Sequence, residues 1–153
     1  MMKVEPQQEH EWLRQLVGDW SYEMADAKYS GSERVRTLGD LWIVGEAKGQ
    51  MPGGSDATWI VTLGYSPQTR RFVGTWVGSM MTHLWVYDGE LDATGRELTL
   101  SAEGPSMSND GTTTLYQDII TIHDPERRTL TARVRDGDGS WKELMKMHFP
   151  RFK

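Results

Sequence analysis

The amino-acid sequence predicts an all-β fold, a single antiparallel meander barrel of about ten strands preceded by a short helix. Short runs rich in β-branched and aromatic residues follow one another, separated by turn residues and by no helical pattern. Ten strands in one sheet would curl, and closing them into a barrel removes both exposed edges. The 153 residues fit one domain.

The first expected element is a short amphipathic helix over about residues 7–17. Trp12, Leu13, Leu16 and Val17 recur at helical spacing after Pro6, and a glycine follows them. All later elements are expected to be strands. The predicted strands are 19–24, 34–38, 41–48, 58–65, 71–77, 83–87, 97–102, 113–122, 129–135 and 141–149. The predicted turns between them include residues 51–54, Ser66-Pro67, Asp88-Gly89, Thr94-Gly95, Asp124-Pro125 and 136–139.

Residues 72–89 are the most informative stretch, because two strand-like runs meet at a tip formed by residues 79–82. An even-numbered loop fixes which side chains share a face of the hairpin. The expected facing pairs are Gly78 with His83, Trp76 with Trp85, and Gly74 with Tyr87. A face on which glycine alternates with large aromatic residues suits the wall of a small barrel.

Two kinds of strand are distinguished by their alternation. Residues 97–102 and 129–135 are apolar on one face only, as expected where the other face is solvated. Residues 41–48, residues 58–65 and the hairpin are apolar or aromatic on both faces. Either the helix or a partner subunit covers their outer face over an ordinary core, or one face lines a cavity.

Composition and charge bear on the expected partners and on the expected compartment. A formal net charge of −5 with interspersed signs and no basic stripe disfavours nucleic acid. The absence of cysteine excludes disulfides and thiolate chemistry, and favours a reducing compartment, so a cytoplasmic location is expected. We expect no membrane association, because no run of 18 apolar residues and no signal-peptide pattern occurs.

A short helix that leads into Gly-x-Trp, here Leu16-Val17-Gly18-Asp19-Trp20, resembles the calycin group: lipocalins, fatty-acid-binding proteins and haem-binding nitrobindins. The segments EHEWLRQLVGDW, MPGG, LGYSP, RFVGTWVGSMMTHLWVYDGELD and LTLSAEGPS together resemble bacterial proteins catalogued as domain of unknown function 1579. This resemblance covers residues 8–149. It implies a lipocalin-like barrel and no established activity.

The leading hypothesis is a protein that binds a small apolar or aromatic ligand inside the barrel. The candidate wall residues are Trp42, Trp59, Trp76, His83, Trp85, Tyr87, Tyr116 and Met145. His83 is either a hydrogen-bonded wall residue or a polar group that orients the ligand. We assign no catalytic residue, metal ligand or cofactor, because the four histidines lack ligand spacing and no catalytic motif occurs.

Three alternatives to simple binding stay open. One is an enzyme on the same barrel with His83 and Asp118 as acid and base. Asp118 is expected to face solvent, and burial with a raised pKa is the alternative for it. Another is haem ligation by His83 or His148, and the third is an assembly protein with a filled core. A cavity below about 300 Å³ would favour the filled core.

Homo-oligomerisation is a further expectation, either through an apolar outer face of the barrel or through the Met80-Met81 tip. Two methionines are unusual at an exposed turn, where Gly, Asn, Asp and Pro dominate. We therefore expect a lid, the N-terminal helix or a second subunit to cover them.

Overall fold

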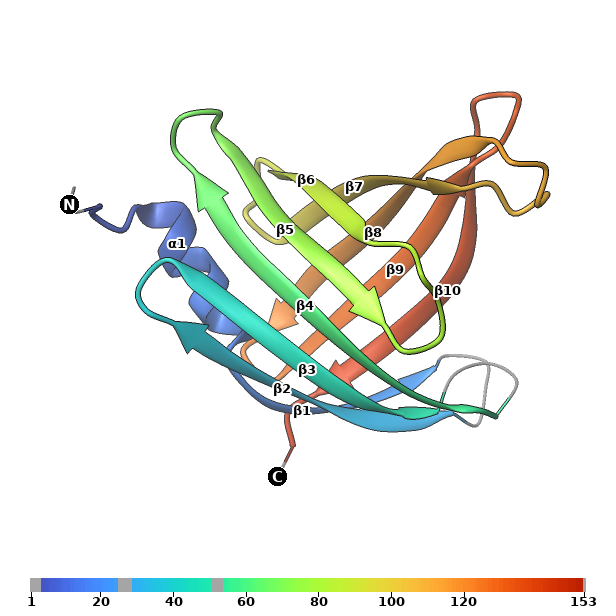
Figure 1. The fold of residues 1–153 in the computed structure, drawn as a ribbon. Helices are drawn as coiled ribbons and strands as arrows, with labels where there is room; N and C mark the ends of the chain where they lie inside the picture. Colours follow the sequence, from blue (N-terminus) through green and yellow to red (C-terminus); the bar gives the residue numbers. More distant parts are fainter. Residues whose placement is uncertain (1–3, 25–28, 51–53, 153) are drawn as a thin grey trace.

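The computed structural model describes residues 4–24, 29–50 and 54–152, which form one closed antiparallel barrel with a short helical segment before it (Figure 1). The helical segment is α1 (Gln8–Leu13) followed by the 3₁₀ turn η1 (Arg14–Leu16). The strands are β1 (Gly18–Met24), β2 (Ser30–Leu38), β3 (Trp42–Gln50), β4 (Asp56–Ser66), β5 (Arg71–Gly78), β6 (Trp85–Leu91), β7 (Glu97–Pro105), β8 (Thr113–Asp124), β9 (Arg127–Arg135) and β10 (Trp141–Pro150).

Each strand pairs with the next along the chain, and β1 pairs with β10 to close the barrel. The closing ladder is short. It consists of Glu23 opposite His148 and Met24 opposite Met147, with an isolated bridge between Trp20 and Arg151. The predicted ten-stranded meander and N-terminal helix are confirmed.

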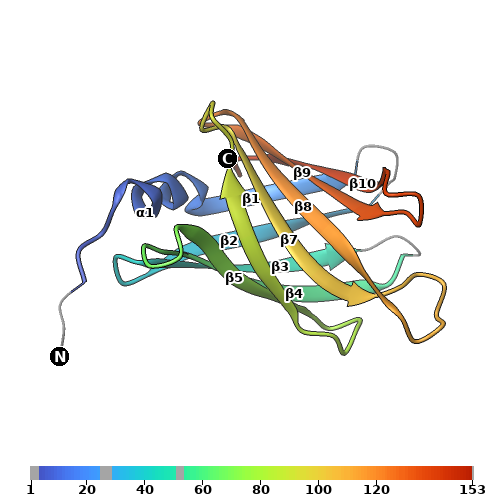
Figure 2. The same cartoon turned by 90° about the horizontal axis from the view of Figure 1, so that it is seen from above.

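The helical segment lies across one end of the barrel (Figures 1 and 2). The indole Nε1 of Trp12 donates a hydrogen bond to the carbonyl of Gly95 over 2.6 Å, and its ring packs edge-on against Phe72. Leu13 and Leu16 are almost fully buried beneath the segment. The helix therefore closes this end and does not cover the outer face of the strands.

No helix among the described residues is long and apolar enough to span a membrane.

The predicted turn at Asp88-Gly89 was wrong. Both residues lie within β6, where Gly89 pairs with Phe72 and Leu100. A side chain at Gly89 would press on those same two residues, so the glycine serves close packing. The predicted turn at 51–54 falls largely outside the described residues, which omit 51–53.

Two β-bulges interrupt the alternation of side chains. One lies between Ile122 and Asp124 on β8 and the other between Glu143 and Met145 on β10. An extra residue on one strand reverses the inward and outward positions beyond it. On β10 the consequence is that the neighbouring residues Leu144 and Met145 both line the cavity, although Leu144 is 38% exposed.

Candidate functional site

The barrel encloses a cavity of about 530 Å³ whose wall is mostly apolar and aromatic. Residues of β2 to β10 line it, and Leu16 of η1 lines it from the helical end. This volume exceeds the roughly 300 Å³ below which ligand sites are uncommon. The alternative of a completely filled core therefore does not describe this barrel.

Seven of the eight predicted wall residues line the cavity: Trp59, Trp76, His83, Trp85, Tyr87, Tyr116 and Met145. The predicted register of the hairpin is confirmed for Trp76 opposite Trp85 and Gly74 opposite Tyr87. Trp59 stacks on Trp76 with ring centroids 6.2 Å apart, and Trp85 meets Tyr116 edge-on at 5.0 Å. The aromatic side chains thus form two contacting pairs on the cavity wall, one from β4 and β5 and the other from β6 and β8.

Trp42 is the exception and was wrongly expected in the cavity wall. It begins β3 on the outer side of the barrel, is 41% exposed, and packs its ring over Gly64 of β4. The inward positions of β3 belong instead to Ile43, Gly45 and Ala47, which are buried. The physical reason is that this strand is apolar on both faces, so the alternation does not mark the inner one.

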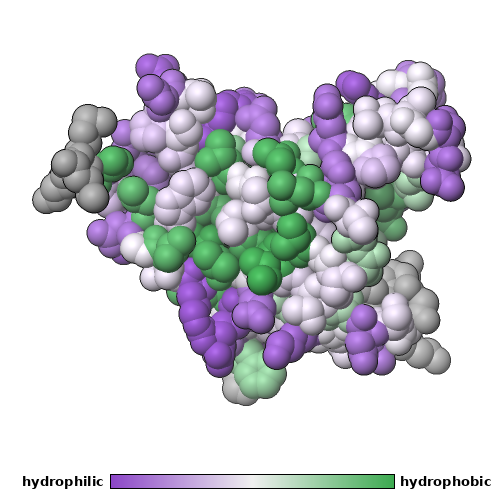
Figure 3. Space-filling model, in the orientation of Figure 1, coloured by the Kyte–Doolittle hydropathy of each residue, from purple (hydrophilic) through white to green (hydrophobic). Residues whose placement is uncertain are grey.

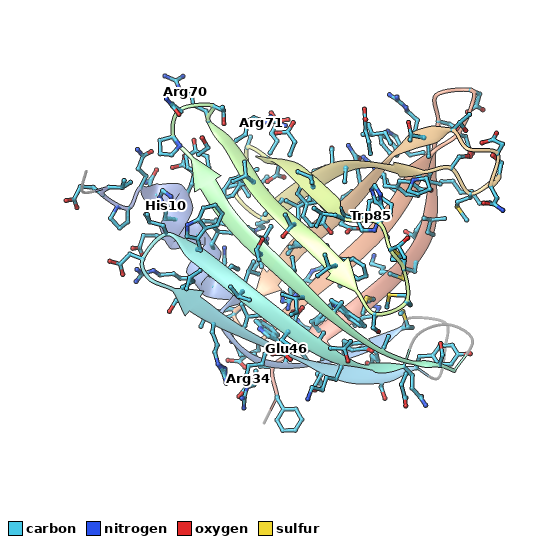
Figure 4. The ribbon with its side chains drawn as sticks, viewed as in Figure 1. His10, Arg34, Glu46, Arg70, Arg71 and Trp85 are labelled. Carbon is cyan, nitrogen blue, oxygen red and sulfur yellow. The ribbon has the colours of Figure 1, made fainter. Side chains whose placement is uncertain are left out.

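His83 lies in the loop between β5 and β6, outside the strand predicted to contain it. The expected pairing with Gly78 is absent from the described ladder, which ends at Trp76 opposite Trp85. The His83 ring Nε2 lies 2.9 Å from the carbonyl oxygen of Glu103, and the ring contacts Trp85 edge-on at 4.6 Å. His83 is therefore a hydrogen-bonded residue near the end of the barrel away from α1, where Figure 4 marks Trp85.

Asp118 was expected to face solvent, and the structure corrects this. It lies on β8 between the inward residues Tyr116 and Ile120, and its accessible surface faces the cavity. The hydroxyl of Tyr87 donates a hydrogen bond to its Oδ2. Burial raises the pKa of the Asp118 carboxyl, and the Tyr87 hydrogen bond opposes that rise.

Tyr87 responds to the same environment. The pKa of its phenol lies well above the ordinary value, because burial disfavours the phenolate and the carboxylates of Asp118 and Glu33 add to that effect. The phenol is consequently a hydrogen-bond donor at any physiological pH.

A second polar pair, Glu33 and Arg128, escaped prediction. Nη2 of Arg128 donates to Oε1 of Glu33 inside the barrel, and the guanidinium lies 4.1 Å from the ring centroid of Phe149 and 4.6 Å from that of Trp20. Burial lowers the pKa of Arg128, and Glu33 opposes the change. The sequence did indicate that both side chains point inward, because Arg128 shares its strand face with Leu130, and Glu33 shares its face with Val35.

The end of the cavity opposite the helix is bordered by exposed apolar side chains. Met81 is 44% exposed and Met107 is 66% exposed, and both line the cavity together with Leu144. The indole Nε1 of Trp85 donates to the sulfur of Met81 over 3.1 Å. Since α1 lies at the other end, the helix does not cover the Met80-Met81 tip.

The outer surface of β4 to β6 carries further exposed apolar residues. Ile60 pairs with Val77 across β4 and β5, and Val86 of β6 lies beside them opposite Thr75. In Figure 3 apolar groups gather over this part of the barrel. Association of two chains through this face stays a prediction.

The arrangement offers binding groups more readily than catalytic ones. Within the described residues, no group of three or more His, Cys, Asp and Glu side chains could hold a metal ion. His83 and Asp118 line the same cavity but are each bonded to another partner, Glu103 and Tyr87 respectively. His148 is not among the residues that line the cavity, so it cannot ligate a group bound there.

Comparison with known proteins identifies a family and a fold. A family model described as "Protein of unknown function (DUF1579)" matches residues 5–151. No curated protein matches the chain. Among solved structures, the S-type phycobiliprotein lyase CPES from Guillardia theta is 13% identical, with 97% of this chain and 99% of that chain covered and a TM-score of 0.51.

A de novo designed fluorescence-activating β-barrel is 15% identical over 89% of this chain and 93% of that one, with a TM-score of 0.47. The barrel EF1p2_mFAP2b, solved with DFHBI bound, is 14% identical over 94% and 98%, with a TM-score of 0.48. At such identities the likeness to CPES concerns the fold alone.

Proposed function

The chain belongs to the DUF1579 family, and since that family's description names no activity, we propose a function from the cavity: the protein binds a small apolar or aromatic molecule inside its barrel. The observation that carries this proposal is the cavity of about 530 Å³ with its aromatic lining. Binding sites for small molecules are typically concave, mostly apolar, and between about 300 and 1,000 Å³ in volume.

The composition of the wall supports the same proposal. Apolar side chains such as Val61, Leu100 and Ile120 contribute the hydrophobic contacts, and three indole rings provide flat surfaces for stacking. A few polar groups, chiefly Tyr87 and Asp118, provide orientation. The methionines at the open end are flexible and polarizable, which suits an entrance that adapts to its ligand.

A neutral hydrophobic dye such as Nile red tests the proposal directly. We expect its fluorescence to rise on mixing with the protein, and the emission of Trp59, Trp76 and Trp85 to be quenched by energy transfer. A dye that leaves both signals unchanged would contradict the proposal. Apolar and aromatic acids, alcohols and amines then serve as competitors.

A pair of neighbouring substitutions on β9 supplies the matched control. Ala132 is buried and lines the cavity, so Ala132→Phe should fill it and weaken dye binding by about tenfold or more. Thr131 is the adjacent residue on the opposite face of the strand, so Thr131→Phe should leave binding unchanged. Circular dichroism verifies that both variants are folded.

An enzyme with His83 and Asp118 as acid and base is the second candidate, supported by the location of both residues on the cavity wall. If this candidate holds, His83→Ala should abolish any turnover of a substrate that the wild-type protein converts.

Haem ligation is the remaining alternative. His83 is the histidine among the described residues of the wall, and its Nε2 already contacts the Glu103 carbonyl. A Soret band on addition of haemin that His83→Ala removes would support that alternative.

A further inference from the structure

The charges on the cavity wall are unbalanced. Among the described residues of this wall, the acidic ones are Glu33 and Asp118, and the one permanently charged basic one is Arg128. Arg128 is paired with Glu33. His83, the other basic residue on the wall, lies near the open end and contacts the Glu103 carbonyl. Asp118 is therefore left without a countercharge among the described lining residues.

Asp118 also has an oxygen open to the cavity. Tyr87 donates to Oδ2, while Oδ1 has no hydrogen-bond partner within the described part of the chain and is not enclosed by protein atoms. The Nε of Arg128 is the reverse case, because it has no partner there and no accessible surface. A ligand in the cavity thus meets a free acceptor at Asp118, whereas the free donor of Arg128 is out of its reach.

The rest of the wall suits a positive charge on an apolar molecule. Trp59, Trp76, Trp85 and Tyr116 line the same space, and the faces of such rings attract cations, most strongly where water is excluded. Burial raises the pKa of the Asp118 carboxyl because a desolvated carboxylate is costly. A cation beside Oδ1 would stabilise the carboxylate and so offset the cost of its desolvation.

Resting on the proposed binding function, we propose that the ligand class is the lipophilic amine, an aromatic or apolar molecule whose ammonium group donates to Asp118 while its body packs against the tryptophans. Tyr87 positions the carboxylate, and the Glu33–Arg128 pair neutralises itself. Under this proposal a carboxylic acid of the same shape is rejected, because it would bring a second negative charge to Asp118.

The test is displacement of bound Nile red by three molecules of matched shape, naphthylethylamine, naphthylethanol and naphthylacetate. We expect the amine to bind about tenfold or more tightly than the alcohol, as a charge-assisted hydrogen bond warrants, and the acid to bind most weakly. This ranking is measured on the unaltered protein, so the test does not depend on whether a variant folds.

Two substitutions locate the selectivity. Asp118→Asn should bring the amine to the affinity of the alcohol. The readout is the ratio of these two affinities in each protein, which cancels any change in Nile red binding. Asp88→Asn is the matched control, because Asp88 is adjacent to Tyr87 but lies on the outer face, paired with Arg71, and it should preserve the amine preference. Retention of the preference in Asp118→Asn would overturn the proposal.

The outcomes separate this proposal from the one on which it rests. Equal affinities for amine and alcohol, or tightest binding of the acid, would overturn the amine class while Nile red binding still supports the cavity function. If Nile red does not bind and the three naphthyl compounds leave the tryptophan emission unchanged, both proposals fall.

Discussion

Arg128 and Glu33, 95 residues apart in the chain, form an ion pair in the interior of the barrel, where their side chains are only 4% and 7% exposed. The pair joins β9 to β2 across the cavity wall, and the guanidinium also packs against the rings of Trp20 and Phe149. It links the strands on either side of β1 and β10, whose own ladder is short.

The first prediction concerns the cost of breaking this pair. Glu33→Gln leaves a buried guanidinium without its countercharge, and we expect the free energy of unfolding to fall by about 3–5 kcal/mol. Asp19→Asn is the control, because the Asp19–Arg34 pair is more than half exposed and should contribute at most about 1 kcal/mol. Figure 4 shows Arg34 on the outer side of the barrel. Equal losses in urea denaturation would contradict the prediction.

The architecture could be predicted because its signal is local. Alternation in residues 97–102 and 129–135 marked an inner face, and Leu98, Leu100, Ala132 and Val134 are indeed buried. The register of the hairpin followed from the parity of its loop. Both inferences depend on a few consecutive residues, because the two-residue period of a strand determines which side chains share a face.

The polar part of the site could not be predicted in the same way. Tyr87 meets Asp118, and Glu33 meets Arg128, across distances set by closure of the barrel, which no local pattern encodes. Trp42 was misplaced because β3 is apolar on both faces. The bulge before Met145 brings two consecutive residues to the cavity wall, a local irregularity that the period of two cannot reveal.

The second prediction is a pH dependence that originates at Asp118. Its pKa is raised above 3.8 in the folded protein, so the folded state retains this proton at pH values where the unfolded chain has lost it. The resulting stability is fully present below about pH 3.8 and is lost as the pH rises through the folded pKa.

Asp118→Asn keeps a neutral side chain at every pH. The unfolding free energy of this variant minus that of the wild type should therefore increase with pH across that window and then level off. Urea denaturation at a series of pH values measures the difference, in which the other carboxyl groups cancel. A difference that is constant with pH would contradict the prediction.

The third prediction concerns the close packing at Gly74, which pairs with Tyr87 and Leu63. A methyl group there would overlap the backbone carbonyl of Thr62 and press on the side chain of Leu63, and relief of the first overlap requires the backbone to move. We expect Gly74→Ala to destabilise the fold by about 1–3 kcal/mol or more. Gly137→Ala, where nothing lies nearby, should change stability by no more than about 0.5 kcal/mol. Thermal unfolding compares the two.

The last prediction concerns Leu16, which belongs to η1 and forms the helical end of the cavity wall. It is 3% exposed, so Leu16→Ala should remove about 2–5 kcal/mol from the free energy of unfolding and enlarge the cavity. A folded variant should accept longer apolar ligands than the wild type, because the added space continues the existing cavity. Leu84→Ala is the control, since Leu84 is 52% exposed and should cost about 0.5 kcal/mol or less. Equal stability losses in the two variants, or an unchanged preference for ligand length in Leu16→Ala, would show that the helical segment does not close the cavity.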